Sequence, residues 1–599
     1  MPQIGTRKIV SKKRKSRGFI LLTHTLMMAI TIGFVGLAVD AGTMYVIKGR
    51  LSSAVDAAAL AAGRSLNLAN TLSAAQTAAT ATANQFFTAN FPSGFLGAGT
   101  PTVSIPPFVD ETDANGNPTG ILDIAVTASV PAPTYFIRIL NVVPFMSAPN
   151  SVIVSATGTA TRRGTVMMLV LDTSISMNTP PDANGLTSCQ EMANAASQFI
   201  TDFSPYDTIG VITFNATATL MYAPSKTFGS DGLGANLAAL GTTCGSSTNT
   251  TAALHLAYSE IKSVGLPLAY NSIVLFTDGS PNGANASFPI RTTADTRYGE
   301  DSKGTTGVCP SYTSTCAMPV LCTSSTPITG VITQGNAQNV TGVTSGVSQS
   351  ISTDPSPVYP AGCSSAQLNG AMRQMVDYIP DTDSWGNSTH GVVATGAGPT
   401  VAAVNGVNMV TRDFWIFQEN NLCGGSLKAA ACANTANGTN PNFVNGGALW
   451  SGFSAVGSGS NFFTAAAGNA ALVGHFRPDQ PNTIVAVSMN TAMAEAYNIR
   501  ADASGCGTNG SVCPTLFHPV INTIYLTGNS TDSVDREFLQ VMANVQTITA
   551  LPYDTGFVQY TNPAFQTNQE QGLYQVTADS TQLNNLFAKL ASEVLRLSH

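Results

Sequence analysis

The sequence predicts an α/β fold built around parallel strands that are buried on both faces. Two continuous apolar runs, residues 166–171 (VMMLVL) and 273–277 (IVLFT), have the composition of such strands, because strands covered by helices on both faces do not alternate. Amphipathic stretches lie between and after these runs, as in an alternating α/β architecture. Each run is followed at once by an aspartate, Asp172 and Asp278. Polar groups are therefore expected at the carboxyl ends of the strands, where ligands of open α/β sheets bind.

The overall composition narrows the class of protein. The 599 residues are enough for several domains, and 44% hydrophobic residues are ample for folded cores. Only 10% of the residues are charged, and the net charge is −7. This balance argues against nucleic-acid binding, which needs clustered Lys and Arg side chains.

The cysteines indicate disulfides in an oxidising compartment. Ten cysteines occur, all between Cys189 and Cys513, without closely spaced pairs of the kind that bind zinc. Buried free thiols are the alternative. The connectivity stays open at the level of sequence. Candidate pairs are Cys423–Cys432 and Cys506–Cys513, which are close in sequence, and Cys189–Cys244, which would bridge two loops.

The N-terminus has the pattern of a membrane anchor. Residues 1–17 form a basic tail with seven Lys or Arg side chains, and residues 18–47 are predicted to form a transmembrane helix. The apolar part, residues 19–39, matches the roughly 20 residues that cross a bilayer. By the positive-inside rule the tail is cytoplasmic and the rest of the chain lies outside. The alternative is a cleaved signal peptide, whose apolar region is usually only about 7–15 residues long.

Residues 48–163 are expected to form a small α+β stalk. An alanine-rich stretch up to about residue 87 predicts a long helix that continues the anchor, and apolar and small polar residues then alternate as in half-buried strands. Asp40 stands near the outer end of the membrane span. It either marks that boundary or pairs with another helix in an assembly, because a charge at membrane depth is costly.

The segments RGFILL and GLAVDAGTMYVIKGRLSSAVDAAALAAG, within residues 17–63, resemble the start of TadG-like (Flp/Tad) pilus-assembly proteins. That family has a basic N-terminus, one membrane helix, an Asp-x-Gly turn and an Asp-Ala-Ala-Ala-Leu-Ala run. The resemblance implies a role in Tad-type (Flp) pilus assembly. It also implies a single-pass bacterial membrane protein whose bulk is periplasmic or on the cell surface.

The polar residues after the first strand have the chemistry of a metal site. Asp172, Ser174 and Ser176 follow one another at alternate positions, Thr248 precedes an amphipathic helix, and Asp278 ends the second strand. Carboxylate and hydroxyl oxygens are hard ligands of the kind that Mg²⁺ prefers. Each piece alone is weak, but together and in this order they are a strong signal.

This set resembles the metal-ion-dependent adhesion site (MIDAS) of the von Willebrand factor type A domain, whose Asp-x-Ser-x-Ser matches Asp172, Ser174 and Ser176 without gaps. The family's threonine maps to Thr248, with Thr250 as the alternative, and its second aspartate maps to Asp278. The resemblance implies a Rossmann-like doubly wound domain that binds Mg²⁺ or Mn²⁺. One coordination position would stay open for an acidic side chain of a protein ligand. The alternative is a fold that has kept these residues and lost the metal.

A type A domain is expected over residues 164–599, interrupted by an insertion at about residues 281–487. The insertion is rich in Gly, Ser, Thr and Asn and contains most of the cysteines. Irregular segments of this length are usually functional or disordered. One hypothesis is that the insertion shapes ligand recognition above the metal; the other is a spacer.

The leading functional hypothesis is a membrane-anchored, extracytoplasmic binding or adhesion protein, acting in pilus assembly or pilus-linked adhesion with pilus components as partners. The alternative is a structural, pilin-like subunit that uses the type A domain as a scaffold. An enzyme is not expected, because the chain has no HExxH, GxSxG or Walker motif. His255 is expected to be a surface or packing residue.

Overall fold

The computed structural model describes two compact units. Unit 1 comprises residues 1–68, 73–109 and 123–162, and unit 2 comprises residues 69–72, 110–122 and 163–599. The residues described within them are 17–66, 71–138, 147–178, 185–279, 281–292, 295–298, 315–318, 323, 325–333, 340–344, 347–349, 376–389, 475–476, 478, 481–502, 517, 519–527, 534–549, 559–562 and 565–598.

Unit 2 is built on a six-stranded sheet with the strand order β18-β15-β8-β5-β6-β7. All neighbouring strands are parallel except β6 and β7. The chain therefore winds outward from β5 in both directions, as in doubly wound folds. The strands are β5 (Thr165–Asp172), β6 (Thr208–Phe214), β7 (Ala218–Ser225), β8 (Tyr270–Thr277), β15 (Val520–Leu526) and β18 (Tyr574–Thr577).

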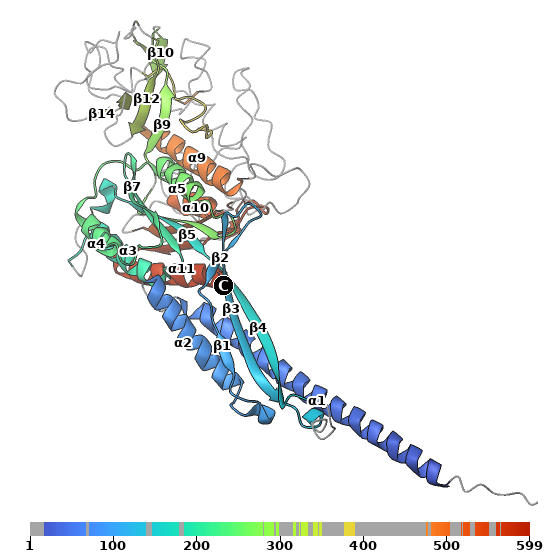
Figure 1. The fold of residues 1–599 in the computed structure, drawn as a ribbon. Helices are drawn as coiled ribbons and strands as arrows, with labels where there is room; N and C mark the ends of the chain where they lie inside the picture. The colour runs from blue at the N-terminus through green and yellow to red at the C-terminus, as the bar shows by residue number, and fades with distance from the viewer. Residues whose placement is uncertain are drawn as a thin grey trace, which may run out of the picture. The chain divides into compact units, whose positions relative to one another are not determined.

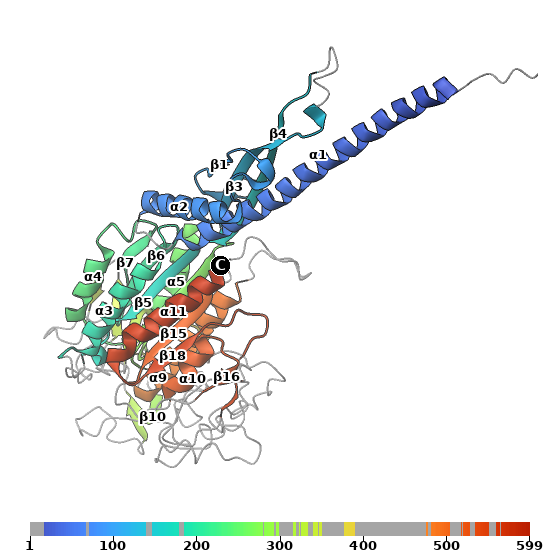
Figure 2. The ribbon, with the colours of Figure 1, turned by 90° about the horizontal axis from the view of Figure 1, so that it is seen from below.

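Helices cover both faces of this sheet (Figures 1 and 2). On one face lie α5 (Thr250–Val264), α9 (Pro481–Arg500) and α10 (Val534–Met542). On the other lie α3 (Ser188–Phe199), α4 (Leu233–Ala239) and α11 (Leu583–Ser598).

The central strand explains why the two cores form. All eight residues of β5 are buried, and successive side chains point to opposite faces. Val166, Met168 and Val170 pack with the helices of one face, and Met167, Leu169 and Leu171 with those of the other. The α/β fold with a strand buried on both faces, expected from the apolar run, is confirmed.

The described parts of the inserted region begin directly after β8. A second sheet has the order β14-β13-β12-β9 with antiparallel pairs, and β10 pairs with β11. The helix α9 starts at Pro481, inside the stretch that the sequence assigned to the insertion, so the insertion ends earlier than expected. The strands of the inserted region are β9 (Gly283–Phe288), β10 (Asp295–Tyr298), β11 (Thr315–Met318), β12 (Ile328–Thr333), β13 (Val340–Thr344) and β14 (Val347–Gln349). Two short strands, β16 (Thr547–Ile548) and β17 (Tyr560–Thr561), lie nearer the C-terminus.

Unit 1 contains two helices and most of a four-stranded sheet, whose residues 110–112 and 118–122 belong to unit 2. The helices are α1 (Arg17–Arg64) and α2 (Leu72–Asn90), and the strands are β1 (Thr102–Ser104), β2 (Val109–Thr112), β3 (Pro118–Pro133) and β4 (Ser151–Arg163). The expected single helix is thus broken between residues 64 and 72. Gly63, Ser65 and Asn67 interrupt the alanine run there, and such residues favour helix ends over helix interiors.

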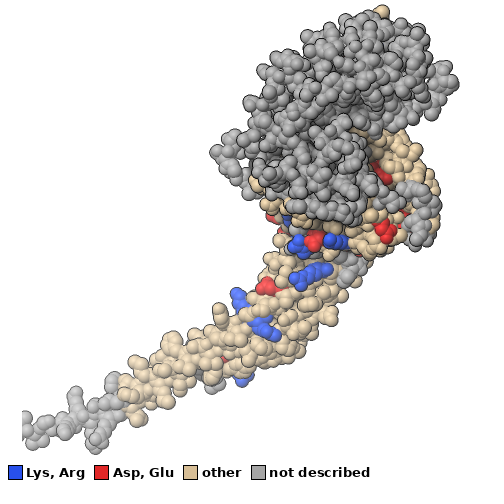
Figure 3. All heavy atoms as spheres, turned by 180° about the vertical axis from the view of Figure 1, so that it is seen from behind, with Lys and Arg blue, Asp and Glu red and all other residues tan. Residues whose placement is uncertain are grey.

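The two halves of α1 have different surroundings. Leu51, Val55, Ala58 and Ala62, which share one helix face, are fully buried. The apolar side chains of the N-terminal half are exposed, and Figure 3 shows that half as a surface almost without charged residues. In the described part of the chain, α1 is the one helix long and apolar enough to cross a membrane.

Asp40 has a partner within its own unit. Its carboxylate is fully buried and accepts hydrogen bonds from the backbone N–H groups of Tyr135 (2.8 Å), Phe136 (2.9 Å) and Ile137 (2.7 Å). These three residues form the turn that follows β3. The carboxylate thus pairs with a turn of the same chain rather than with a separate helix.

Candidate metal centre

The sheet topology brings the two sequence-predicted aspartates to one edge. Strands β5 and β8 are adjacent and parallel, with Leu171 opposite Phe276. Asp172 is the last residue of β5, and Asp278 directly follows β8. Their carboxylates therefore leave the sheet at the same carboxyl end, where ligands of α/β sheets bind.

Asp172 is a fully buried carboxylate surrounded by neutral donors. One oxygen accepts the backbone N–H of Ser174 (2.8 Å), and the other accepts the hydroxyl of Thr277 (2.6 Å). Burial raises the pKa of Asp172 to about 6, against the opposing effect of these hydrogen bonds. A buried negative charge of this kind favours a cation as neighbour.

The two serines connect to the second aspartate. Ser176 donates its hydroxyl hydrogen to Asp278 (2.7 Å), and the hydroxyl oxygens of Ser174 and Ser176 are 2.8 Å apart, within hydrogen-bond distance. Ser174 is buried, whereas Ser176 is exposed. The structure thus places Asp172, Ser174, Ser176 and Asp278 in one local cluster.

Thr248 lies in the neighbouring loop. The loop is hydrogen-bonded to the serine segment, since Ile175 N–H donates to the Ser246 carbonyl (2.8 Å) and Gly245 N–H donates to the Thr173 carbonyl (2.8 Å). The buried Thr248 donates its backbone N–H to the side-chain oxygen of Asn282 (2.7 Å). These backbone hydrogen bonds hold the loop, and with it Thr248, close to the serine segment. The Thr248 side chain itself makes no hydrogen bond to the four described residues of the cluster.

Thr250, the alternative to Thr248, is the first residue of α5 and is fully buried. Its hydroxyl has no hydrogen-bond partner among the described residues. Position favours Thr248, which precedes the helix and belongs to the loop bonded to the serine segment.

A disulfide joins helix α3 to the start of the loop that carries Thr248. Cys189, in the first turn of α3, is bonded to Cys244, four residues before Thr248. This is one of the three pairs expected from the sequence. The pairs Cys423–Cys432 and Cys506–Cys513 lie outside the described residues.

The donor set fits a hard divalent cation. It combines two carboxylates with serine and threonine hydroxyls, the oxygen ligands that suit Mg²⁺ and Mn²⁺. Within the described ranges, no group of three or more His, Cys, Asp or Glu side chains is arranged for a metal. Any ion at this edge of the sheet would therefore depend on the hydroxyl oxygens.

Sequence reasoning missed two residues of this edge. Thr277 orients the buried carboxylate of Asp172, and its position immediately before Asp278 was the available signal. Ile175 is 67% exposed between the two serines, an apolar side chain next to the cluster. The separate expectation for His255 agrees with the geometry, since it contacts Glu495 (3.0 Å) and stacks on Trp385.

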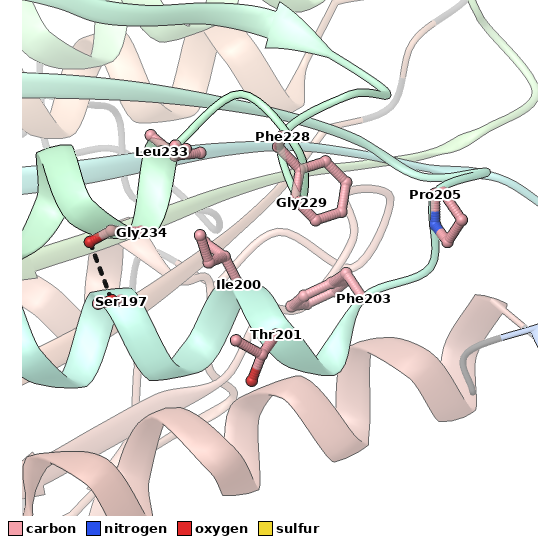
Figure 4. A pocket seen from close by; sticks show the side chains of 10 residues that line it. Ser197, Ile200, Thr201, Phe203, Pro205, Phe228, Gly229, Leu233 and Gly234 are labelled. Atoms are coloured by element: carbon pink, nitrogen blue, oxygen red, sulfur yellow. Dashed lines mark hydrogen bonds between the residues drawn. The ribbon is translucent and has the colours of Figure 1, made fainter. Parts of the chain in front are cut away.

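A pocket of about 160 Å³ lies elsewhere in unit 2 (Figure 4). Ile200, Phe203, Phe228 and Leu233 contribute its apolar lining, and a hydrogen bond from the Ser197 hydroxyl to the Gly234 carbonyl (3.0 Å) crosses one side. None of its lining residues belongs to the candidate metal centre. The pocket and the metal centre are thus separate features.

Two family models match the chain. Residues 167–280 match the von Willebrand factor type A domain, and residues 18–65 match the putative Flp pilus-assembly TadE/G-like family. The chain thus carries a TadE/G-like N-terminal segment and a type A domain. Both resemblances drawn from the sequence are confirmed, and the type A match spans the stretch from β5 to the residues after Asp278.

Solved structures to which the chain is similar include three pilus proteins. One is the pilus adhesin SpaC from Lactobacillus rhamnosus GG, at 9% identity and a TM-score of 0.31, covering 82% of this chain and 36% of that one. The PilB minor pilin from Streptococcus sanguinis has 10% identity and a TM-score of 0.30, with 83% and 79% covered. The vWF domain of the type V pili tip protein Mfa5 from Porphyromonas gingivalis has 12% identity and a TM-score of 0.28, with 74% and 98% covered. The chain thus spans about a third of the length of SpaC, and no curated protein matches it.

Proposed function

We propose that this chain is a membrane-anchored protein of a Tad-type pilus whose type A domain binds a protein ligand through Mg²⁺ or Mn²⁺. One observation carries the proposal. Asp172, Ser174, Ser176 and Asp278 form one cluster at the carboxyl edge of the sheet. Asp172 is buried there, and the groups that donate hydrogen bonds to its carboxylate are neutral.

Each residue has a distinct task in this proposal. Asp172 and Asp278 supply negative charge, and the hydroxyls of Ser174, Ser176 and Thr248 supply neutral oxygens. A bound divalent ion would supply positive charge for the acidic side chain of a ligand at its open coordination position. The hydrogen bond from Thr277 orients Asp172, as second-shell groups do at metal sites.

The inserted region is proposed to shape ligand recognition at this edge. At its start, Asn282 exchanges hydrogen bonds with Thr248, and the side-chain oxygen of Asn285 accepts one from the Asn249 side chain, in the loop that carries the candidate threonine. The first residues of the insertion are thus hydrogen-bonded to the loop that carries Thr248. This contact supports a role in recognition over a plain spacer.

The pilus setting rests on the N-terminal segment. Residues 18–65 match a pilus-assembly family, and α1 is long and apolar enough to span a membrane. With the basic tail in the cytoplasm, the type A domain lies outside, in the periplasm or at the cell surface. An oxidising compartment agrees with the Cys189–Cys244 disulfide.

Calorimetric titration of Mg²⁺ into the full-length protein in detergent tests the metal. We expect one ion per chain for the wild type and no detectable binding for Asp172→Asn. The matched control is Asp202→Asn, since Asp202 lies in the 3₁₀ turn that follows α3, before the amino end of β6. Equal binding by wild type and Asp172→Asn would remove the metal from the account.

Proton relaxation of water with bound Mn²⁺ tests the open position. A Mn²⁺ ion that keeps an exchangeable water enhances the relaxation, and a carboxylate that replaces this water reduces the enhancement. N-acetyl-aspartate amide should therefore reduce it, and N-acetyl-asparagine amide should not. The same response to both compounds would contradict recognition of an acidic side chain.

A structural, pilin-like role is the second candidate. One observation favours it, namely the division of α1 into an exposed apolar half and a half packed on a sheet, which suits assembly through the exposed half. Normal pilus formation by the Asp172→Asn variant, with loss of adhesion only, would favour the metal-dependent role. Loss of filaments on deletion alone, with no effect of Asp172→Asn on adhesion, would favour the structural role.

A further inference from the structure

The N-terminal half of α1 exposes apolar side chains on all sides. Between Leu21 and Val39 its large apolar residues are 44–73% exposed. In the described part of residues 21–46, only Gly36 and Asp40 are buried. Another segment of unit 1 therefore covers α1 at Gly36 and Asp40, while the neighbouring apolar side chains of the helix stay exposed.

The turn after β3 is what covers Gly36 and Asp40. Three successive N–H groups of the turn donate to the Asp40 carboxylate. Phe136 lies directly on Gly36, where an added Cβ would come within 2.7 Å of the Phe136 Cβ. The turn is thus fixed at one height on α1, and Figure 1 shows α1 continuing past this end of β3 and β4.

The residues that face outward at this height are apolar. Tyr135 and Phe136 are each 41% exposed, and Leu96 is 45% exposed. The Tyr135 hydroxyl donates to the Leu96 carbonyl (3.1 Å), and the 3₁₀ turn that contains Leu96 (η2, Phe95–Gly97) contacts α1. Two segments distant in sequence therefore form one surface, the interfacial patch of Leu96, Tyr135 and Phe136.

The position of the patch along α1 matches the boundary of a bilayer. Gly36 lies three residues before Val39, the end of the apolar run, which is about 5 Å at 1.5 Å per residue. Aromatic side chains are enriched at this depth of a membrane. The exposed Arg138 follows the patch, as a basic side chain that reaches headgroups does.

We propose that the interfacial patch is a second membrane contact, seated in the interfacial layer of the bilayer that α1 spans, at the end of the span away from the basic tail. The patch continues the exposed apolar surface of α1 through the contact of Phe136 with Gly36. Asp40 is satisfied by its own chain and requires no partner helix. A bilayer is therefore the occupant that fits, and the contact does not depend on any metal.

Depth-dependent fluorescence quenching in liposomes tests this. The full-length Phe136→Trp variant is reconstituted at low protein-to-lipid ratio in phosphatidylcholine–phosphatidylglycerol vesicles, with or without lipids brominated near the headgroup end of the acyl chain. The signal is the excess over wild type, which has three tryptophans of its own. Phe34→Trp is the control inside the span, because Phe34 is 69% exposed on α1.

Val109→Trp is the control outside the membrane. Val109 is 60% exposed and is the first residue of β2, which residues 113–117 join to the first residue of β3. Tyr135, in contrast, lies just beyond the last residue of β3. The 16 residues of β3 separate the two by about 50 Å at 3.3 Å per residue. Tyr135→Trp is a second variant at the patch, in case Phe136→Trp disturbs the contact with Gly36.

We expect tryptophans at positions 34 and 136 to lose fluorescence with brominated lipid and to emit at shorter wavelength, and a tryptophan at 109 to do neither. Quenching at 34 with none at 136 or 135 overturns the proposal. A blue shift at 136 that grows with protein density and is insensitive to bromine also overturns it, since a second copy then covers the patch. Absence of quenching at 34 overturns it as well, because α1 itself is then not embedded.

Discussion

At the scale of single residues, the account depends on a buried carboxylate. Asp172 is buried, and its pKa is raised to about 6. A group with a raised pKa in the folded state contributes stability below its unfolded pKa of 3.8, and that contribution is lost as pH rises through 6. In the absence of metal, the ionised carboxylate therefore destabilises the folded protein at neutral pH.

The first prediction follows from this sign. In EDTA at pH 7.5, Asp172→Asn should raise the free energy of unfolding by about 1–3 kcal/mol, since a shift of one pKa unit corresponds to about 1.4 kcal/mol. The gain should shrink as pH falls from 6 to 4, where the wild-type carboxyl group is protonated. Thermal and chemical unfolding with and without Mg²⁺ measure this. A variant that is less stable than wild type in EDTA at pH 7.5 would contradict it.

A second prediction concerns Thr277. Thr277→Val removes the hydroxyl that donates to Asp172, and loss of such supporting groups typically weakens metal affinity about 10–100-fold. Thr277→Ser keeps the hydroxyl and should bind Mg²⁺ like the wild type. Calorimetric titration of both variants is the measurement. Unchanged affinity in the valine variant would exclude a role for this contact.

The sequence was informative about residues placed by local rules. Asp172 and Asp278 could be grouped because the ends of neighbouring parallel strands meet at one edge. The partner of Asp40 could not be predicted, because the turn that binds it is 95–97 residues away. Contacts at such separation depend on tertiary packing, which leaves no local signal in the chain.

At the scale of elements, α1 and β4 touch at a glycine. A Cβ at Gly158 of β4 would meet backbone atoms of Val55 and Asp56 of α1 at 2.6 Å. Backbone atoms cannot move away as a flexible side chain can. Close packing of this helix on this strand therefore requires glycine at position 158.

The third prediction is that Gly158→Ala lowers the free energy of unfolding of unit 1 by about 1–3 kcal/mol, the usual effect of overpacking. Gly49→Ala is the matched control, since a Cβ at Gly49 meets nothing within 4 Å and alanine favours the helix. Hydrogen exchange of residues 50–62 is the measurement. Equal protection in both variants would show that the contact is not tight.

The fourth prediction concerns the disulfide of Cys189 and Cys244, which are 55 residues apart. Replacing both by serine should lower the free energy of unfolding by about 2–4 kcal/mol, because the unfolded chain loses a constraint. Mg²⁺ binding should also weaken, since the bond lies four residues from Thr248. Denaturant unfolding and calorimetry test the two effects. Unchanged stability and affinity would mean that the bond is dispensable for the metal loop.

The elements that the sequence predicted well are those with a strong periodic or continuous pattern. The strands β5 and β8 stand where the two apolar runs indicated them. The break between α1 and α2 was missed, as was the start of α9 before the expected end of the insertion at residue 487. In both cases the boundary depends on weak helix preferences that tertiary packing overrides.

At the scale of the whole molecule, the chain combines two units with separate cores. Unit 1 contains the candidate membrane helix and the interfacial patch, and unit 2 contains the sheet and the candidate metal centre. We thus propose that anchoring and ligand binding belong to different parts of one chain.

The central claim is a divalent metal at the carboxyl edge of the type A sheet, and anomalous diffraction from crystals of the full chain grown with Mn²⁺ tests it most directly. We predict one anomalous peak about 2 Å from the hydroxyl oxygens of Ser174 and Ser176, the usual distance from a small divalent cation to oxygen. Crystals of Asp172→Asn should lack the peak. A wild-type map without a peak at these serines, at saturating Mn²⁺, would contradict the account.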